Sequence, residues 1–345
     1  MVHTLNPLAD NRWDDLVARH PKASIFHHRG WLEALARTYG YTPLVLTSTP
    51  PGVALKDGIA LCRVSSWLTG TRLVSLPFAD HCEPLLDTDS NFMEFAQWMR
   101  TECDRQRWKY VELRPLSESC DLDCDLASSK SYYFHELDLM PVLSQIFQRF
   151  HKTSLQQKIR RAEKMRLTYE LGRTENLLEE FYGLLVKTRK RHQLFPQPRT
   201  WFTNLIECLG DNVQIRVARK DGSAVAALLT LRHRFSVVYK YGCSDENFHN
   251  LGGMPLLLWM FIQESKAAGA TQLDFGRSDT DNEGLVAFKD RFGSTRKALT
   301  YLRYPQVQKE ATGDSWFVKT AKHVFSMMPN TISPVAGSIL YRHIG

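Results

Sequence analysis

The sequence predicts an α+β fold in which two similar domains follow one another. In the first half, a turn at Asp57-Gly58 precedes two apolar runs at 59–64 and 72–78. A helical pattern at 91–107 and a short strand ending at Arg114 come next. Apolar runs joined by a turn are typical of antiparallel strands. We therefore expect mixed, mainly antiparallel sheets with flanking helices.

The second half repeats this order. A turn at Asp221-Gly222 precedes runs at 224–232 and 235–241, and a helix at 254–268 leads to a strand at 272–276. This repetition indicates an internal duplication. Matching landmarks lie at nearly constant offsets: 164 residues from Asp57 to Asp221, 161 from Cys82 to Cys243, and 163 from Arg114 to Arg277.

A doubly wound dinucleotide-binding fold is disfavoured, because the sequence contains no Gly-x-Gly-x-x-Gly fingerprint. Two unrelated α+β domains remain the alternative to a duplication. We expect two tandem domains, at 1–140 and 141–305, followed by a helical tail at 306–345.

Charge and cysteine usage restrict the function classes. The chain has 44 Lys and Arg against 37 Asp and Glu, and this net charge of +7 favours a phosphate-bearing partner or an anionic membrane surface. A mildly basic protein without such a partner has the same balance. The seven cysteines form no Cys-x-x-Cys pair, which predicts reduced thiols and no zinc site.

Hydropathy predicts a cytoplasmic protein. The first 20 residues contain no apolar signal-peptide core, and the longest apolar run, 254–262, is far too short to span a bilayer. The tail pattern at 316–328 is amphipathic, with Trp316 and Phe317 opposing Lys319. Residues 316–345 therefore either pack on the body or contact the inner membrane face peripherally.

Two basic helical stretches separate the halves, at 141–166 and 177–193. Cations near a helix C-terminus are stabilised by the helix dipole, which explains part of this enrichment. Arg160, Arg161 and Lys164 lie at one-turn spacing and are candidates to bind a phosphate. A solvated helix face is the alternative.

The segment 273–293 concentrates the residue types that acyl transfer to an amine requires. One group must accept the proton of the amine, and another must stabilise the developing oxyanion. Asp279 or Asp281 fits the first role, and Arg277 with Lys289 fits the second. The first half has Pro-Leu-Ser at the matching place, 115–117, so the chemistry is predicted in the second half alone. An ordinary solvated acidic loop is the alternative.

Further candidates surround this segment. We expect substrate contacts from Asn282, Glu283 and Phe288 in the segment itself, from Tyr239 and Tyr241 on one face of the preceding strand, and from Asp80 and His81 at a strand end in the first half. The acidic residues lack the spacing of an EF-hand, so we expect no metal. No Ser-His-Asp or Cys-His arrangement is evident, so we expect no covalent intermediate.

These stretches together resemble the FemAB-related, BioF2-like GNAT acyltransferases of bacteria. The most specific match is LDFGRSDTDNEGLVAFKDRFGS at 273–294. Weaker matches are Phe26-His27 with Trp31, IRRAEK at 159–164, TRKRH at 188–192 with Gln197-Pro198, and the closing LYRHIG at 340–345.

The resemblance implies tandem GNAT-like domains, transfer of an acyl or aminoacyl group to an amine, and no permanently bound cofactor. In the Fem branch the donor is an aminoacyl-tRNA and the acceptor is a peptidoglycan precursor. A related group occurs in exopolysaccharide gene sets. The Phe-Lys pair of the Fem enzymes, implicated in transfer, corresponds to Phe288-Lys289.

Acyl-CoA-dependent members hold pyrophosphate with an Arg/Gln-x-x-Gly-x-Gly/Ala loop before the central helix. The matching stretch here, HNLGGMP at 249–255, begins with His and has Met at the last position, and Pro255 lacks an amide N–H. The matching stretch of the first half, 85–89, contains no glycine. These departures count against coenzyme A in its usual binding mode.

Three functions remain open from the sequence. The leading hypothesis is transfer of an acyl or aminoacyl group to an amine of a cell-envelope or polysaccharide precursor, with either aminoacyl-tRNA or acyl-CoA as donor. A conventional acyl-CoA-dependent N-acetyltransferase is the second. The third is a non-catalytic module that holds RNA or a lipid-linked phosphate on the basic face at 158–166. We expect a monomer.

Overall fold

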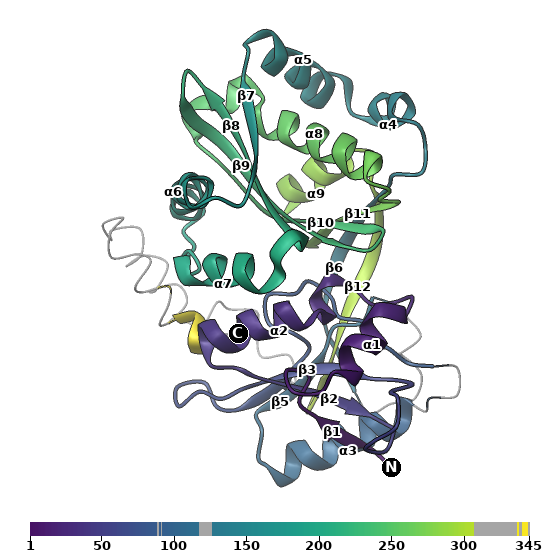
Figure 1. Ribbon diagram of the computed structural model, residues 1–345. Coiled ribbons are helices and arrows are strands. Elements are labelled where there is room, and N and C mark those ends of the chain that lie inside the picture. Colours follow the sequence, from purple (N-terminus) through teal and green to yellow (C-terminus); the bar gives the residue numbers. More distant parts are fainter. Residues whose placement is uncertain (88–89, 91, 117–125, 307–336, 338–339, 344–345) are drawn as a thin grey trace. The chain divides into compact units, whose positions relative to one another are not determined.

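The computed structural model describes residues 1–87, 90, 92–116, 126–306, 337 and 340–343, which form two compact units (Figure 1). The first unit contains residues 1–132, 298–306 and 340–343, and the second contains 133–297 and 337. Each unit is a mixed sheet with flanking helices.

The first unit has the sheet order β1-β2-β3-β4-β5-β12. Its elements in chain order are β1 (His3–Leu5), α1 (Arg12–Arg19), η1 (Ile25–His27), α2 (Arg29–Tyr39), β2 (Thr42–Thr47), β3 (Ile59–Val64), β4 (Arg72–Val74), α3 (Phe92–Arg105) and β5 (Tyr110–Leu113). The strands β6 (Ala127–Asp138) and β12 (Thr295–Tyr304) each contribute residues to both units.

The second unit has the sheet order β6-β11-β10-β9-β8-β7. Its helical elements before the central strands are α4 (Leu143–Arg149), η3 (Lys152–Gln156), α5 (Gln157–Lys164), α6 (Glu175–Arg191), α7 (Arg199–Leu209) and η4 (Gly210–Asn212). The remaining elements are β7 (Thr168–Gly172), β8 (Val213–Lys220), β9 (Ser223–His233), β10 (Ser236–Ser244), η5 (Glu246–Leu251), α8 (Gly253–Ala267), β11 (Gln272–Asp279) and α9 (Glu283–Asp290).

Both sheets share one pattern of strand pairing. Three successive antiparallel pairs are followed by one parallel pair, β4 with β5 or β10 with β11, and a helix, α3 or α8, connects the two parallel strands. The last strand is exchanged, because β12 pairs with β5 whereas β6 lies beside β11. The tandem α+β organisation predicted from the sequence is confirmed.

Most elements lie where the sequence places them, since β3 covers 59–64 and α8 begins one residue before the expected start. One element differs in kind: α9 occupies part of a segment that we interpreted as a loop. The amphipathic pattern at 316–328 lies outside the described residues. No helix among the residues that the structure describes is long and apolar enough to cross a membrane.

The core of the second unit fixes its helices against the sheet. Helix α6 packs on β8, β9 and β10 from one face, and α8 packs on the same strands from the other face (Figure 1). On the α8 side, Phe292 contacts both Phe150 and Phe275, with ring centroids 5.2 and 5.4 Å apart. Aromatic pairs of this kind contribute about 0.5–1.5 kcal/mol each beyond burial. This cluster joins α9 and α4 to β11.

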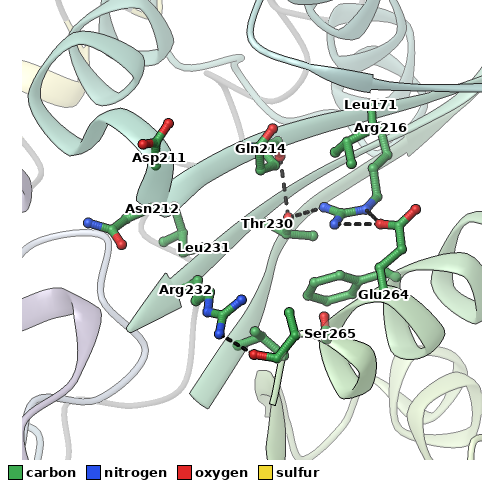
Figure 2. Close-up of a pocket in the computed structure, with 13 residues that line it drawn as sticks. Leu171, Asp211, Asn212, Gln214, Arg216, Thr230, Leu231, Arg232, Glu264 and Ser265 are labelled. Atoms are coloured by element: carbon green, nitrogen blue, oxygen red, sulfur yellow. Dashed lines mark hydrogen bonds and ion pairs between the residues drawn. The ribbon is translucent and has the colours of Figure 1, made fainter. Parts of the chain in front are cut away.

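A buried ion pair ties the C-terminal half of α8 to β8. The Arg216 guanidinium donates to Glu264 Oε2 from Nε at 3.2 Å and from Nη2 at 2.9 Å, and Nη1 donates to Thr230. The other carboxylate oxygen of Glu264 accepts from the Tyr169 hydroxyl at 2.7 Å. Figure 2 shows this pair on the wall of a pocket of about 350 Å³. The pocket lies where β10 begins and α8 ends, beside the start of β11 and at the opposite end of this parallel pair from the C-terminal end of β11.

Replacing Glu264 with Ala should lower the free energy of unfolding by about 3 kcal/mol or more, because the buried Arg216 charge loses its partner. The matched control is Arg173→Ala, which removes an exposed ion pair with Asp211 and should change stability by less than about 1 kcal/mol. Urea denaturation measures both. Equal losses in the two variants would contradict this account of the network.

Candidate active site

The parallel pair of the second unit separates part-way along its strands. Pairing between β10 and β11 runs only from Ser236–Gln272 to Val238–Asp274. Both strands continue, β10 to Ser244 and β11 to Asp279. Their diverging ends lack mutual hydrogen bonds, so the backbone groups there need other partners.

Lys289 of α9 satisfies two of those groups. Its side chain is 2% exposed, and its ammonium donates to the carbonyl oxygens of Gly276 at 3.0 Å and Arg277 at 2.7 Å. Successive carbonyls of a regular strand point in opposite directions. Gly276 has φ +71°, a conformation that glycine adopts readily and that breaks this alternation. The carboxylate of Asp274 accepts the Gly276 N–H at 2.5 Å and supports the turn.

Helix α9 is positioned by its two ends. At its start, the Asn282 side chain accepts the Leu285 N–H at 3.1 Å and so caps the helix, and Glu283 adds a favourable negative charge to the first turn. Past its end, the Arg291 carbonyl accepts the His151 N–H at 2.8 Å. Two of the predicted substrate contacts, Asn282 and Glu283, thus have local roles in placing Lys289.

His135 of β6 is a further residue of this region, and no local sequence pattern indicates it. Its side chain is 0% exposed, and Nε2 lies 3.2 Å from Oδ1 of Asp290, the residue after Lys289. Burial and the positive charge of Lys289 together hold the pKa of His135 below its usual value, and Asp290 opposes this only in part. A neutral imidazole therefore lies beside the Lys289 ammonium.

Ser278 is a second unpredicted member of this region. Its side chain is buried on β11, and its hydroxyl has no hydrogen-bond partner among the described residues. A buried hydroxyl normally finds a partner, so the unsatisfied hydroxyl of Ser278 is an exception within β11.

The acidic residues of the segment, Asp279, Asp281 and Glu283, are exposed at the end of β11 and the start of α9. Phe288 is half-buried and contacts Phe292 edge-on at 5.4 Å. Arg277 and Asp279 lie on β11, and the Lys289 ammonium of α9 reaches the backbone carbonyl of Arg277. Across the part of the chain that is described, no group of three or more His, Cys, Asp or Glu residues could hold a metal ion.

The expectation that Tyr239 and Tyr241 share one strand face was wrong. A β-bulge shifts the register between them, so Tyr239 pairs with Thr230 and Tyr241 with the next residue, Leu229. Tyr239 contacts Phe275 on the α8 side, whereas Tyr241 accepts a hydrogen bond from Trp201 of α7 at 3.0 Å.

The basic residues of α5 remain candidates. Ile159 and Ala162 bury one face of the helix, while Arg160, Arg161 and Lys164 are exposed on the other. The Arg160 guanidinium lies 5.9 Å from the centre of the Phe147 ring.

A separate pocket of about 360 Å³ lies beside the connection from β10 to α8, between Lys187, Lys190 and Arg191 of α6 and the stretch 245–247. Lys187 donates to Asp245 at 2.7 Å, and this hydrogen bond lowers the pKa of that carboxyl. The pocket thus carries both signs of charge. Farther along the connection, Gly252 is in the left-handed region at φ +78°, and the carbonyl of Lys158 lies directly against it.

The predicted residues of the first unit are engaged within that unit. The Asp80 carbonyl accepts the Tyr301 hydroxyl at 2.7 Å, and His81 is buried edge-on against Phe26 at 5.4 Å. Arg114 donates to the carbonyls of Leu76 and Ala79 at 3.2 and 3.1 Å.

Residues 149–289 match the family described as "Acetyltransferase (GNAT) domain". The second unit therefore contains a GNAT acetyltransferase domain, and this domain marks the protein as a transferase. No curated protein matches the sequence significantly.

Several solved structures share the fold of almost the whole chain. FemX has a TM-score of 0.69 at 14% identity, covering 88% of this chain and 97% of its own. The C-terminal domain of a proposed lysylphosphatidylglycerol synthetase from Agrobacterium fabrum gives 0.59 at 16% identity, covering 93% and 95%. A tandem GNAT protein of the clavulanic acid pathway gives 0.53 at 12% identity, covering 88% and 98%.

The buried, neutral His135 predicts a pH dependence of stability. Because its pKa is lower in the folded state, the unfolded chain takes up the proton first, and the free energy of unfolding should fall as the pH drops below about 6.5. His135→Gln should flatten this part of the profile, whereas His3→Gln in β1 should not. Urea denaturation between neutral and mildly acidic pH measures the slopes. A wild-type slope in His135→Gln would contradict the assignment.

Proposed function

We propose that this protein transfers an aminoacyl or acyl group to an amine of a cell-envelope or polysaccharide precursor, at the diverging end of β11 in the second unit. The observation that supports this proposal most directly is a pair of hydrogen bonds. The buried Lys289 ammonium donates to two consecutive carbonyls of β11, at the point where β10 and β11 separate. This arrangement fixes a positive charge beside an open strand end, within a domain of the GNAT superfamily.

The chemistry requires one bond to form and one to break. The acceptor amine attacks the acyl carbonyl carbon, the oxyanion develops, and the bond to the donor oxygen or sulfur then breaks. Asp279, exposed at the end of β11, accepts the amine proton, with Asp281 as the alternative base. Arg277 and Lys289 supply the positive potential that stabilises the oxyanion. We assign a substrate contact to the Ser278 hydroxyl, because it has no hydrogen-bond partner among the described residues.

Aminoacyl-tRNA is the favoured donor. The start of α8 is a poor pyrophosphate site, because the Lys158 carbonyl lies against Gly252 and Pro255 has no N–H to offer. The fold is similar to those of FemX and of a proposed lysylphosphatidylglycerol synthetase. The second name describes a lipid that carries an amino acid, and this supports an aminoacyl donor. The exposed cations of α5, Arg160, Arg161 and Lys164, are suited to the phosphates of such a donor. No permanently bound cofactor is required.

The second candidate is a conventional acyl-CoA-dependent N-acyltransferase, which the GNAT family match favours. Calorimetry with acetyl-CoA and longer acyl-CoAs separates the two. Micromolar binding of an acyl-CoA would replace aminoacyl-tRNA as the proposed donor.

Substitution of Lys289 tests the site. Lys289→Ala should lower kcat by about 100-fold or more, because it removes the fixed charge and frees the end of β11. Transfer from a pool of labelled aminoacyl-tRNAs to amine acceptors prepared from envelope precursors measures the rate.

Two comparisons make this test specific. Lys297→Ala removes an exposed lysine that pairs with Glu136 on the neighbouring strand, and it should keep wild-type activity. Thermal denaturation of Lys289→Ala shows whether the folded protein persists at the assay temperature. Wild-type turnover by folded Lys289→Ala would rule out the proposed site.

A further inference from the structure

The connection between β3 and β4 exposes two large apolar side chains. Trp67 is 87% exposed and the adjacent Leu68 is 58% exposed. The connection itself is ordered, because the Ser66 hydroxyl accepts the N–H groups of Leu68 at 3.1 Å and Thr69 at 2.9 Å. A fixed backbone thus holds Trp67 and Leu68 out into solvent. We call residues 65–71 the β3–β4 tip.

The end of the chain is anchored on the same tip. His343 lies with Nδ1 2.9 Å from the Ser66 hydroxyl, and its carbonyl accepts from Thr69 at 2.6 Å and from the buried Arg72 at 2.9 Å. The Trp67 ring stands edge-on to the His343 ring at 5.8 Å. Arg342, next to this anchor, is exposed.

Cations also reach the tip from a third segment. The turn between α3 and β5 brings Lys109 beside it, since the Lys109 N–H donates to the Thr71 carbonyl at 2.7 Å. A Cβ built on Gly70 would lie 3.7 Å from that of Lys109. Lys109 is exposed, as is Arg107 earlier in the same turn. Three segments far apart in sequence therefore combine exposed apolar groups with exposed cations.

The second unit offers a natural comparison. Its matching connection, between β9 and β10, is only the two residues Arg234 and Phe235, whereas the β3–β4 connection has seven, from 65 to 71. Phe235 is 62% exposed, but it is a single apolar side chain. The longer connection and the anchored chain end belong to the first unit alone among the described residues.

We propose that the β3–β4 tip, with Lys109 and Arg342, binds an anionic lipid surface. Tryptophan is favoured at the boundary between headgroups and acyl chains. Transfer of the Leu68 side chain from water to that boundary is also favourable, because apolar surface is buried. The flanking cations are attracted to anionic headgroups. A projecting pair of side chains buries too little area for a stable protein interface, which favours a lipid partner over a folded one. This inference goes beyond the proposed transfer reaction and does not depend on it.

Sedimentation with lipid vesicles tests the proposal. The full chain should bind vesicles that contain phosphatidylglycerol, bind pure phosphatidylcholine much less, and be released by salt. The double variant Trp67→Ser/Leu68→Ser should bind the anionic vesicles about tenfold more weakly, because two anchoring side chains are lost. Lys109→Glu should also weaken binding, most strongly at low salt.

Phe235→Ser is the matched control, because it removes an exposed aromatic side chain from the equivalent connection of the other unit. It should bind the anionic vesicles as the wild type does. Binding by Trp67→Ser/Leu68→Ser at wild-type strength would overturn the proposal. So would an equal loss in Phe235→Ser, or an absence of binding by the wild type.

Discussion

The separation of β10 from β11 is the constraint on which the second unit depends. Beyond Val238 and Asp274 the two strands no longer bond one another, so their backbone groups must find other partners. Lys289 supplies one solution, because a single buried ammonium meets two β11 carbonyls that the turn at Gly276 has aligned. The cap at Asn282, the aromatic contact with Phe292 and the pair with His135 hold α9 where that ammonium can reach.

The first unit solves the same problem differently. Its parallel strands β4 and β5 also end in a region that needs partners for backbone carbonyls. There Arg114, at the end of β5 itself, donates to the carbonyls of Leu76 and Ala79 and pairs with Glu112 at 3.0 Å. Arg114 thus satisfies backbone carbonyls in the first unit, as Lys289 does in the second. Among the described residues, the acidic loop and the lysine-bearing helix α9 follow β11 of the second unit.

The sequence predicts the architecture well because the relevant signals are local. Alternating apolar runs, turns at Asp57-Gly58 and Asp221-Gly222, and constant offsets identify both sheets without knowledge of tertiary contacts. The exchange of β6 and β12 is not local, since a strand pattern does not reveal which sheet the strand joins. Helix α9 escaped notice because it is only eight residues long and follows an acidic, glycine-containing stretch.

The site was predicted less completely, for related physical reasons. The two-residue period of a strand predicts that Tyr239 and Tyr241 lie on one face. A one-residue bulge between them turns the two side chains to different faces. The pairing of His135 with Asp290 joins residues 155 positions apart, and nothing in either local sequence indicates it. The sequence indicates Lys289 through its charge and its place beside Phe288. The structure adds that this charge is buried and bonded to backbone, which makes it the organising group of the strand end.

Hydrogen–deuterium exchange with and without a pool of aminoacyl-tRNAs, and separately with acyl-CoA, tests the central claim most directly. The account predicts that aminoacyl-tRNA slows exchange at the end of β11 and in α9, between Gly276 and Lys289, and leaves the matching end of β5 in the first unit unchanged. Protection confined to the end of β5, or no protection of β11 by either donor, would contradict it.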